Sequence, residues 1–413
     1  MSLLTITSIL ITVSALFAYL NHRTLKLPTT IGIMVISLIF SVTLVILSQF
    51  GYGGLLESAT ELVAQVDFDE TLLQGMLAFL LFAGAMHVNL NLLLRAKWVI
   101  GILASIGVIS STFMVAGASY LVLQWVGLPL PFIYCLLFGA LISPTDPVAV
   151  LGVLKYAGVS KPLETKIAGE SLFNDGIAIV LFLAIYGIAV EGKELSFSHI
   201  GVLFFQEAIL GAIFGFLCGW VVLQMLKRVD EYQVEVLLTL ALVMGCATGA
   251  AALHLSAPIA VVVAGLMIGN HGRQNAMSNT TIQHLDTFWE LVDEILNAVL
   301  FLLIGLEVIL LTFSGSIWIA GIVLCVCVLL ARFIAVGIPV TLLKLKRDFH
   351  PHVIKILTWG GLRGGISVAL ALSLPAGKER DIIVAITYVI VVISIVGQGL
   401  TIGKLVKATA EPT

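Results

Sequence analysis

Apolar runs long enough to cross a lipid bilayer recur along almost the whole chain of 413 residues. A spanning helix needs about 20 predominantly apolar residues. Hydrophobic residues make up 60% of this chain, whereas Asp, Glu, Lys and Arg together make up only 11%, against about a quarter in soluble domains. One very apolar soluble core is disfavoured because no polar face remains to cover it. The sequence therefore predicts an all-α polytopic membrane protein.

The apolar runs number about thirteen, which sets the expected number of transmembrane helices. The first is followed by a basic loop and further apolar sequence without a small-residue cleavage site, so we expect a retained helix rather than a signal peptide. The expected spans are approximately 3–20, 27–47, 71–94, 98–125, 130–154, 162–190, 200–226, 235–253, 256–270, 291–312, 316–344, 352–374 and 381–402.

Lysine and arginine gather in alternate connections between these spans. The intervening connections hold only Lys193, Lys378 and Arg380, and the 48–70 loop is acidic. Because cytoplasmic loops carry the positive excess, we expect the N-terminus outside and the C-terminus in the cytoplasm, with the cell (inner) membrane as the location. The basic connections contain Arg23, Lys26, Arg95, Lys97, Lys155, Lys161, Lys166, Lys227, Arg228, Arg273, Lys344, Lys346, Arg347, Lys404 and Lys407.

The chain resembles itself at an offset of roughly 220–230 residues. Six spans, one linker span and six further spans would give the second copy the opposite orientation, as in the inverted repeats of many secondary transporters. We therefore expect one transporter domain, 1–413, made of a first repeat (1–190), a linker helix (200–226), a second repeat (235–402) and a short cytoplasmic tail (403–413). The matching segments, in order, are 27–32 with 257–262, 81–87 with 302–307, Trp98 with Trp318, and 139–141 with 360–362.

The fifth span is interrupted by two prolines that flank a threonine and an aspartate. Pro144 and Pro147 lack a backbone N–H and clash with carbonyls one turn back, and freed carbonyls survive at membrane depth only where they line a cavity or meet a partner. The oxygens of Thr145 and Asp146 could then bind a small hard cation. The structural alternative is a proline kink in which Asp146 caps a half-helix.

The sixth span carries four polar residues on one helical face. Glu170 and Asn174 are four residues apart, as are Ser171 and Asp175, so the four side chains lie within about 140° of one another around the helix. A carboxylate in hydrocarbon costs roughly 2.5–3.5 kcal/mol on insertion scales. Asp175 is the candidate for a site at which a proton and a cation compete; a polar network for helix packing is the structural alternative.

Two arginines lie within later spans and need anionic partners. Arg363 stands among glycines in the twelfth span, and a buried guanidinium requires a counter-charge, for which Glu170 is the natural candidate. Arg332 in the eleventh span has no evident partner, although it could brace the core against a carboxylate such as Glu307.

Other polar residues within or near the spans are expected to have packing roles. His87 and His254 do not cluster, and we expect both to be satisfied packing or interfacial residues. The segment 271–290 alternates polar and apolar residues and predicts a helix that lies on the membrane surface. The five cysteines show no metal-binding or disulfide spacing, and no catalytic residues, resident metal or cofactor are expected.

The interrupted fifth span, the polar face of the sixth and the glycine-flanked arginine resemble the monovalent cation:proton antiporter family. The resemblance is to the branch that contains archaeal and bacterial Na⁺/H⁺ exchangers and the animal sodium/hydrogen exchangers, and span order agrees along nearly the whole chain. The motifs that carry it are Ser143-Pro144-Thr145-Asp146-Pro147, Gly169-Glu170-Ser171-Leu172-Phe173-Asn174-Asp175-Gly176 and Gly360-Gly361-Leu362-Arg363-Gly364.

This resemblance implies a fold and a mechanism. It implies thirteen helices in two inverted six-helix repeats, two broken crossed helices in a mobile core, and a homodimer that works by an elevator-like movement. Its partners would be membrane lipid, a second copy and small ions, with no nucleic acid.

The resemblance also assigns roles to residues. Asp175 would bind the ion with help from Ser171, Asp146 and the Thr145 backbone. Glu170 would pair with Arg363, and Asn174 would stabilise that region. The Asn174-Asp175 pair is typical of the electroneutral branch.

One departure concerns the third span. Family members place an acidic residue there near the ion, where this chain has His87. The resemblance therefore leaves the ligand from this span unassigned.

The function expected is exchange of Na⁺ or Li⁺ for H⁺, with K⁺/H⁺ exchange on the same scaffold as the alternative. A channel would need a continuous polar pore, whereas the sequence offers one cluster. A membrane-embedded hydrolase would need a Ser–His, paired-aspartate or metal-ligand arrangement within the spans, and none is evident.

Overall fold

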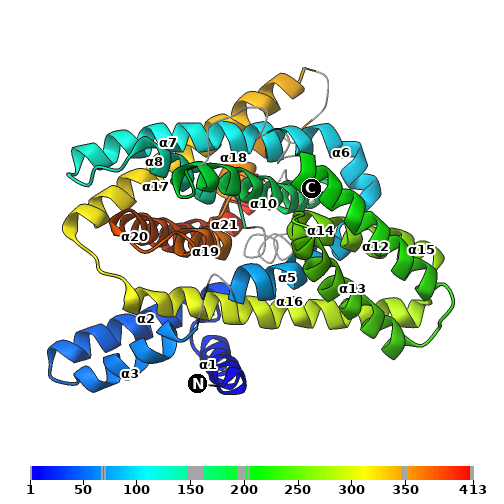
Figure 1. The fold of residues 1–413 in the computed structure, drawn as a ribbon, viewed down its shortest axis with the longest axis horizontal. Coiled ribbons are helices and arrows are strands. Elements are labelled where there is room, and N and C mark those ends of the chain that lie inside the picture. The colour runs from blue at the N-terminus through cyan, green and yellow to red at the C-terminus, as the bar shows by residue number, and fades with distance from the viewer. Residues whose placement is uncertain are drawn as a thin grey trace.

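The computed structural model describes residues 2–66, 68, 71–146, 161–192, 201, 205–345, 349 and 351–409. Over these ranges the protein is helical, with one isolated antiparallel bridge between Asp146 and Leu362. Figure 1 shows the helices as one bundle, in which α16 runs lengthwise with α1, α2 and α3 below it and α19 and α20 above it. The prediction of an all-α architecture is confirmed.

The helices follow the predicted spans closely in most places. Their bounds are α1 Leu3–Arg23, α2 Thr29–Gln49, α3 Gly53–Ala64, η1 Thr71–Met76, α5 Leu77–His87, α6 Leu90–Ile102, η2 Leu103–Gly107, α7 Val108–Trp125, α8 Phe132–Ile142, α10 Lys161–Ala189, η3 Phe205–Leu210, α12 Gly211–Leu226, α13 Tyr232–Ala252, α14 Ala257–Met267, η4 Ile268–Gly272, α15 Arg273–Asn275, α16 Asn279–Glu307, η5 Val308–Leu310, α17 Gly315–Leu343, α18 Val353–Trp359, α19 Gly365–Leu372, α20 Lys378–Ile393, η6 Ser394–Gln398 and α21 Gly399–Thr409.

Eight of the described helices are long and apolar enough to cross a membrane, judged by length and composition. Two shorter apolar helical segments, Thr71–His87 and Phe132–Ile142, add to them. The number of thirteen spans and the division into two inverted repeats stay predictions. The second half of the predicted fifth span, 147–154, lies outside the described residues.

Polar side chains mark where several helices begin. The hydroxyls of Ser256, Ser278 and Ser314 accept hydrogen bonds from backbone N–H groups in the first turns of α14, α16 and α17. Such caps satisfy donors that the helix itself leaves unpaired.

The predicted continuous span 71–94 is wrong. Helix α5 ends at His87, and α6 begins at Leu90 because the Asn89 side chain accepts a hydrogen bond from Leu92 N at 3.1 Å. From there the chain stays helical through η2 and α7, as one run of 36 residues from Leu90 to Trp125. The apolar residues on both sides of Asn89 hid this boundary in the sequence.

The predicted surface helix at 271–290 is also wrong over its second half. Residues from Asn279 onward belong to α16, which continues to Glu307. Leu285 and Trp289 are buried, and the indole Nε1 of Trp289 donates to Thr239 Oγ1 of α13 at 3.1 Å. The apolar residues of this segment therefore face neighbouring helices rather than a membrane surface.

The helices form two large packed regions. In one, α7 packs on α8, α17 packs on α7 and α20, and α10 packs on α6 and α8. In the other, α14 lies between α5, α12 and α13, while α16 packs on α2, α5 and α13. The interrupted segments lie in the first region.

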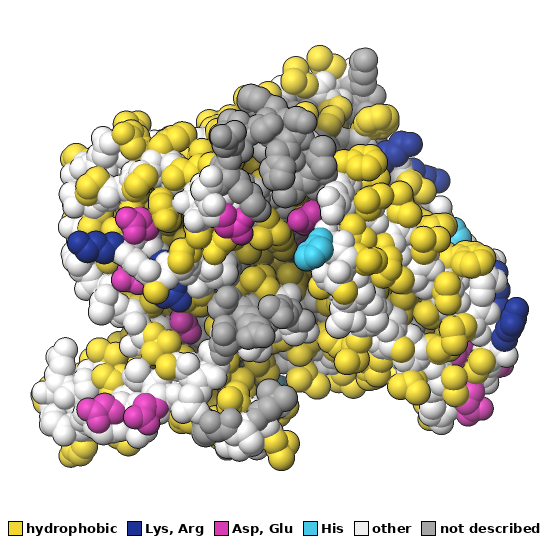
Figure 2. Space-filling view, in the orientation of Figure 1, with side chains coloured by type: hydrophobic (Ala, Val, Ile, Leu, Met, Phe, Trp, Pro, Cys, Tyr) yellow, Lys and Arg dark blue, Asp and Glu magenta, His cyan; other side chains and the backbone are white. Residues whose placement is uncertain are grey.

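The outer surface is predominantly apolar. On the face in Figure 2, hydrophobic side chains cover most of the described surface, and charged side chains are few. Trp98, Leu121, Trp125 and Leu237 are among the large apolar side chains left exposed. A surface of this kind suits lipid rather than water.

Helices α7 and α8 approach so closely at Gly139 that a side chain has no room. A Cβ built there would lie 2.3 Å from the Thr112 carbonyl oxygen. We expect Gly139→Ala to destabilise the protein by about 1–3 kcal/mol through overpacking, seen as a lower melting temperature in detergent. Gly117→Ala in α7 is the matched control because nothing lies within 4 Å of its Cβ position. Equal melting temperatures for the two variants would contradict this account.

Candidate cation site

The two interrupted spans cross each other inside the protein. Helix α8 ends at Ile142, and the chain is extended at Asp146. Helix α18 ends at Trp359, and α19 begins at Gly365. The backbone N–H of Asp146 donates to the Leu362 carbonyl at 2.8 Å, which forms the antiparallel bridge between them.

Arg363 ties the crossing together with its side chain. Its Nη1 donates to the Ser143 carbonyl at 2.5 Å and to the Pro144 carbonyl at 2.9 Å. These carbonyls belong to the two residues that directly follow α8, which ends at Ile142. One buried guanidinium therefore hydrogen-bonds two backbone carbonyls at the end of α8.

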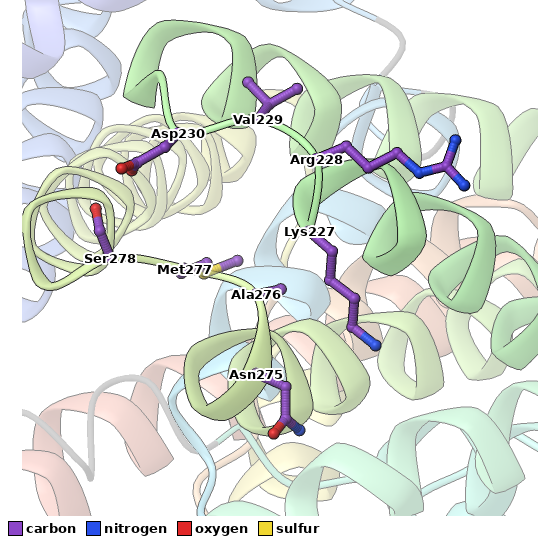
Figure 3. A pocket seen from close by; sticks show the side chains of 8 residues that line it. All are labelled: Lys227, Arg228, Val229, Asp230, Asn275, Ala276, Met277 and Ser278. Atoms are coloured by element: carbon purple, nitrogen blue, oxygen red, sulfur yellow. The ribbon is translucent and has the colours of Figure 1, made fainter.

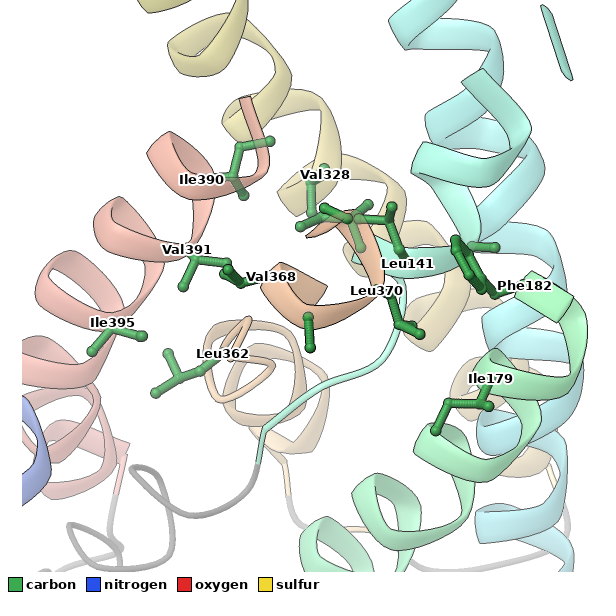
Figure 4. Packing of buried hydrophobic residues seen from close by; sticks show 14 of the residues in the cluster. Leu141, Ile179, Phe182, Val328, Leu362, Val368, Leu370, Ile390, Val391 and Ile395 are labelled. Atoms are coloured by element: carbon green, nitrogen blue, oxygen red, sulfur yellow. The ribbon is translucent and has the colours of Figure 1, made fainter. Parts of the chain in front are cut away.

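Leu362 anchors the same segment in the apolar core. Its side chain is fully buried, and Figure 4 shows it beside Ile395, with Val368 beside Val391. The crossing is thus held by apolar packing on one side and by backbone hydrogen bonds on the other.

Helix α10 brings the polar face of the predicted sixth span against this crossing. The Asn174 amide donates to Thr145 Oγ1 at 2.8 Å, and Thr145 N donates to Asn174 Oδ1 at 3.4 Å. The hydroxyls of Thr145 and Ser171 are 3.1 Å apart. All three side chains are buried, so the structure brings these predicted site residues together.

Asp175 lies on the same helix and is 3% exposed. The carboxylate of Asp146 is near enough to repel it electrostatically. Among the described residues, no hydrogen bond or ion pair engages the Asp175 carboxylate. A buried carboxylate in this position favours a bound cation or proton, because an isolated anion in an apolar interior is costly.

The predicted pairing of Glu170 with Arg363 is wrong. Both oxygens of Glu170 accept from Arg332 of α17: Oε1 from Nη1, and Oε2 from Nη2 at 2.8 Å. Arg332 Nη2 also donates to the Leu357 carbonyl of α18 at 3.2 Å. Such a two-point arginine–carboxylate contact is a strong form of ion pair. It also rules out Glu307 as the main partner of Arg332.

The sequence could not separate the two arginines because both are buried cations. Their roles depend on which backbone carbonyls lie nearby. Arg363 belongs to the interrupted segment and reaches the opposite segment, whereas Arg332 reaches α10 from the neighbouring helix α17.

Two hydroxyl residues that sequence reasoning missed hold the end of α8. Ser143 Oγ donates to the Gly139 carbonyl at 2.7 Å and lies 3.1 Å from Ser111 Oγ, and Thr112 Oγ1 donates to Ser143 Oγ at 3.3 Å. Their only signal in the sequence is a run of three hydroxyl residues, 110–112, within an apolar span.

His87 is exposed at the end of α5, beside polar groups of its neighbours. Its Nδ1 is 2.8 Å from the Ala83 carbonyl, and its Nε2 is 4.0 Å from Asp286, which Arg273 binds with both Nη atoms. Within the described residues, its recorded hydrogen bond and ion-pair contact do not reach the cluster around Asp175.

A cavity of about 450 Å³ opens elsewhere, between the α12–α13 connection and the start of α16. Figure 3 shows Lys227 directed toward Asn275, and Asp230 near Ser278. It shares no lining residue with the cluster around Asp175. Within the described ranges, no group of three or more His, Cys, Asp or Glu residues could hold a metal ion.

Comparison with known proteins identifies the family. Residues 11–408 match the family described as "Sodium/hydrogen exchanger, transmembrane". The chain belongs to the sodium/hydrogen exchanger family. This exchanger is a membrane transport protein, not an enzyme.

Two bacterial relatives resemble the exchanger over nearly its full length. It is 53% identical over 401 residues to the Na⁺/H⁺ antiporter NhaP of Pseudomonas aeruginosa, with 96% of this chain and 95% of the relative covered. It is 33% identical over 392 residues to the Na⁺/H⁺ antiporter NhaH of Halobacillus aidingensis, with 93% of each chain covered.

A solved structure shares the fold of the exchanger. The sodium proton antiporter MjNhaP1 of Methanocaldococcus jannaschii, determined at pH 8, matches with a TM-score of 0.75 over 100% of both chains. Its sequence identity is 19%, so this match concerns the fold alone.

The Glu170–Arg332 contact predicts a specific pattern of coupling. Removing one partner of a buried ion pair leaves an uncompensated charge and costs about 3–5 kcal/mol. We expect Glu170→Gln and Arg332→Gln each to lower the melting temperature strongly. In this double-mutant cycle, the melting temperature of the double variant should fall by much less than the sum of the two single decreases.

The same cycle with Arg363→Gln in place of Arg332→Gln is the control. Because Arg363 donates to backbone carbonyls and meets Glu170 only through a longer-range electrostatic attraction, its coupling to Glu170→Gln should be clearly weaker than that of Arg332. If Glu170 coupled more strongly to Arg363 than to Arg332, the Glu170–Arg363 pair predicted from the sequence would be correct and the Glu170–Arg332 pair would be wrong.

Proposed function

We propose that this exchanger moves Na⁺ in exchange for H⁺ by alternating access, with the two ions competing for Asp175. The observation that carries the proposal is the buried Asp175 carboxylate, which stands beside hydroxyl residues and a second aspartate without a cationic partner among the described residues. The antiporter names of the bacterial relatives support the same activity.

Competition follows from the kind of groups gathered there. Oxygen ligands from carboxylates, hydroxyls and carbonyls suit a hard cation. The residues placed to supply them are Asp175, Asp146, Ser171 and Thr145. A proton on Asp175 removes the negative charge that the cation needs, so the two ions exclude each other. This exclusion becomes antiport when the site opens to one side of the membrane at a time.

An electroneutral exchange of one proton for one cation is supported by the other charges of the site. Glu170 is neutralised by Arg332. Asn174, next to Asp175, is an uncharged amide whose oxygen and nitrogen both contact Thr145. These contacts leave Asp175 as the carboxylate whose charge is exchanged in our proposal.

Na⁺ rather than K⁺ is the cation we propose. The curated relatives carry the name Na⁺/H⁺ antiporter, which does not favour the K⁺/H⁺ alternative. Li⁺, a smaller ion of the same charge, is proposed as a further substrate.

The remaining proposals concern the arrangement in the cell. We place the N-terminus outside and the C-terminus in the cytoplasm of the cell (inner) membrane, on the strength of the lysine and arginine bias. The offset matches in the sequence support two inverted repeats, 1–190 and 235–402, joined by a linker helix at 200–226. Residues up to Thr409 of the predicted tail belong to α21. A homodimer is proposed on the family resemblance.

The direct test is exchange by the purified protein in proteoliposomes. Adding Na⁺ outside acid-loaded vesicles should raise the internal pH, and K⁺ should do so much less. We expect Asp175→Asn to abolish this movement, because a neutral amide cannot alternate between a proton and a cation. Glu235→Gln is the control, since Glu235 is also a buried carboxylate but lies in α13 beside Thr281. Exchange retained by Asp175→Asn would refute the assignment.

Competition at one site also predicts a particular pH dependence. Lowering the pH raises the proton occupancy of the site, so the apparent KM for Na⁺ should rise while Vmax at saturating Na⁺ stays nearly constant. With equal pH on both sides, initial rates across a Na⁺ series at several pH values measure this. A fall in Vmax at constant KM would point instead to a proton that binds somewhere other than the cation site.

A further inference from the structure

The interruption of α18 and α19 exposes backbone groups that must find partners inside the protein. Residues 360–364 lie between the two short helices. An unsatisfied backbone group in hydrocarbon costs several kcal/mol. The Leu362 carbonyl meets Asp146 N, and the N–H groups of Gly360 and Gly361 reach back to α18. The Trp359 carbonyl and the Arg363 N–H mark the two edges of the interruption.

Two buried side chains from the last long helix reach both edges. Ser394 Oγ accepts from Arg363 N at 3.1 Å, and Gln398 Nε2 donates to the Trp359 carbonyl at 2.9 Å. Ser394 is 1% exposed and Gln398 is 5% exposed. They are the first and last residues of η6, a π-helical turn between α20 and α21. Single π-helical turns of this kind are frequent at functional sites.

The direction of every hydrogen bond in this pair is fixed. Ser394 Oγ donates to Gln398 Oε1 at 2.5 Å, so its lone pairs are left for the Arg363 N–H. The Gln398 amide oxygen is therefore occupied by Ser394, and its nitrogen donates to the Trp359 carbonyl. The two side chains thus act as one unit that spans the interruption, and loss of either removes a partner that the other cannot replace.

The same interruption carries the contacts that shape the cation site. The Arg363 side chain binds the carbonyls of Ser143 and Pro144, and the Leu362 carbonyl binds Asp146 N. These contacts lie immediately beside Thr145, which α10 holds through Asn174 and Ser171. A shift of residues 360–364 would therefore shift the oxygens of Thr145 and Asp146.

We propose that Ser394 and Gln398 are positioning residues of the cation site, which set its affinity for the cation by fixing the interruption at 360–364. In the part of the chain that the structure describes, their hydrogen bonds reach the backbone of Arg363 and Trp359 and each other. The proposal rests on the proposed function of the Asp175 cluster for its effect on affinity, and on the hydrogen bonds alone for its effect on the backbone.

The chain offers a closely matched control. Thr401 of α21 also contacts Trp359, but it accepts from the indole Nε1 at 2.8 Å rather than binding the backbone. Thr401→Val therefore removes a hydrogen bond between the same two segments and leaves the groups at the interruption paired.

Hydrogen exchange on the purified full-length protein tests the backbone part. We expect Ser394→Ala and Gln398→Met to speed amide exchange in a peptide covering 360–366, with Ser394→Thr close to the parent because it keeps the hydroxyl. Thr401→Val should leave this peptide unchanged. Parent-like exchange in Ser394→Ala and Gln398→Met would overturn the proposal.

Transport kinetics test the affinity part. In proteoliposomes, Ser394→Ala and Gln398→Met should raise the apparent KM for Na⁺ by about threefold to tenfold, the range expected for a lost buried partner. Vmax per folded protein should change less, Ser394→Thr should restore most of the KM, and Thr401→Val should keep it. A lower Vmax or melting temperature with an unchanged KM would mean a merely structural role.

The two experiments separate this proposal from the proposed function. A parent protein that moves no protons when Na⁺ is added would refute the function. The hydrogen-exchange comparison would still decide whether Ser394 and Gln398 hold the interruption.

Discussion

Backbone hydrogen bonding at the crossing of residues 143–146 with residues 360–364 is the constraint on which the rest of the site depends. At membrane depth, water is not available to satisfy broken helices. Each segment therefore forms backbone hydrogen bonds with the other. Asp146 N meets the Leu362 carbonyl, and Arg363 meets the Ser143 and Pro144 carbonyls. Because Thr145 contacts Asn174 and Ser171 of α10, the arrangement that pairs the backbone also brings several polar oxygens together.

The two buried arginines bind different kinds of partner because of this constraint. A guanidinium carries five donors and no acceptor, so it can serve either several carbonyls or one carboxylate with both oxygens. Arg363 takes the first role at the crossing, and Arg332 takes the second with Glu170. The negative charge of Glu170 is thereby neutralised, whereas Asp175 has no cationic side chain as a partner among the described residues.

Much of this arrangement could be predicted from the sequence, because hydrocarbon makes polar residues conspicuous. The prolines around Thr145, the polar face of α10 and the glycines around Arg363 each stand out against apolar neighbours. What failed were choices between similar groups and boundaries within apolar sequence. Glu170 had two arginines available. The predicted span 71–94 ran through the break between α5 and α6, although His87, Asn89 and Asn91 are polar and Asn89 caps α6. The buried face of α16 depends on Thr239 of a separate helix, which sequence spacing does not reveal.

The unbroken helical run from Leu90 to Trp125 has a mechanical consequence. At 1.5 Å per residue, its 36 residues measure about 54 Å along the helical path, against a hydrocarbon thickness of about 30 Å. In Figure 1, α6 turns away from the line of α7 near the π-helical turn η2. The outer face of α6 exposes Arg95, Lys97 and Trp98, side chains that favour the headgroup layer. Since α6 packs directly on α10, any movement of α10 along the membrane normal would carry these side chains through the interface. Bilayer thickness and headgroup charge would then contribute to the energy barrier of the transport cycle.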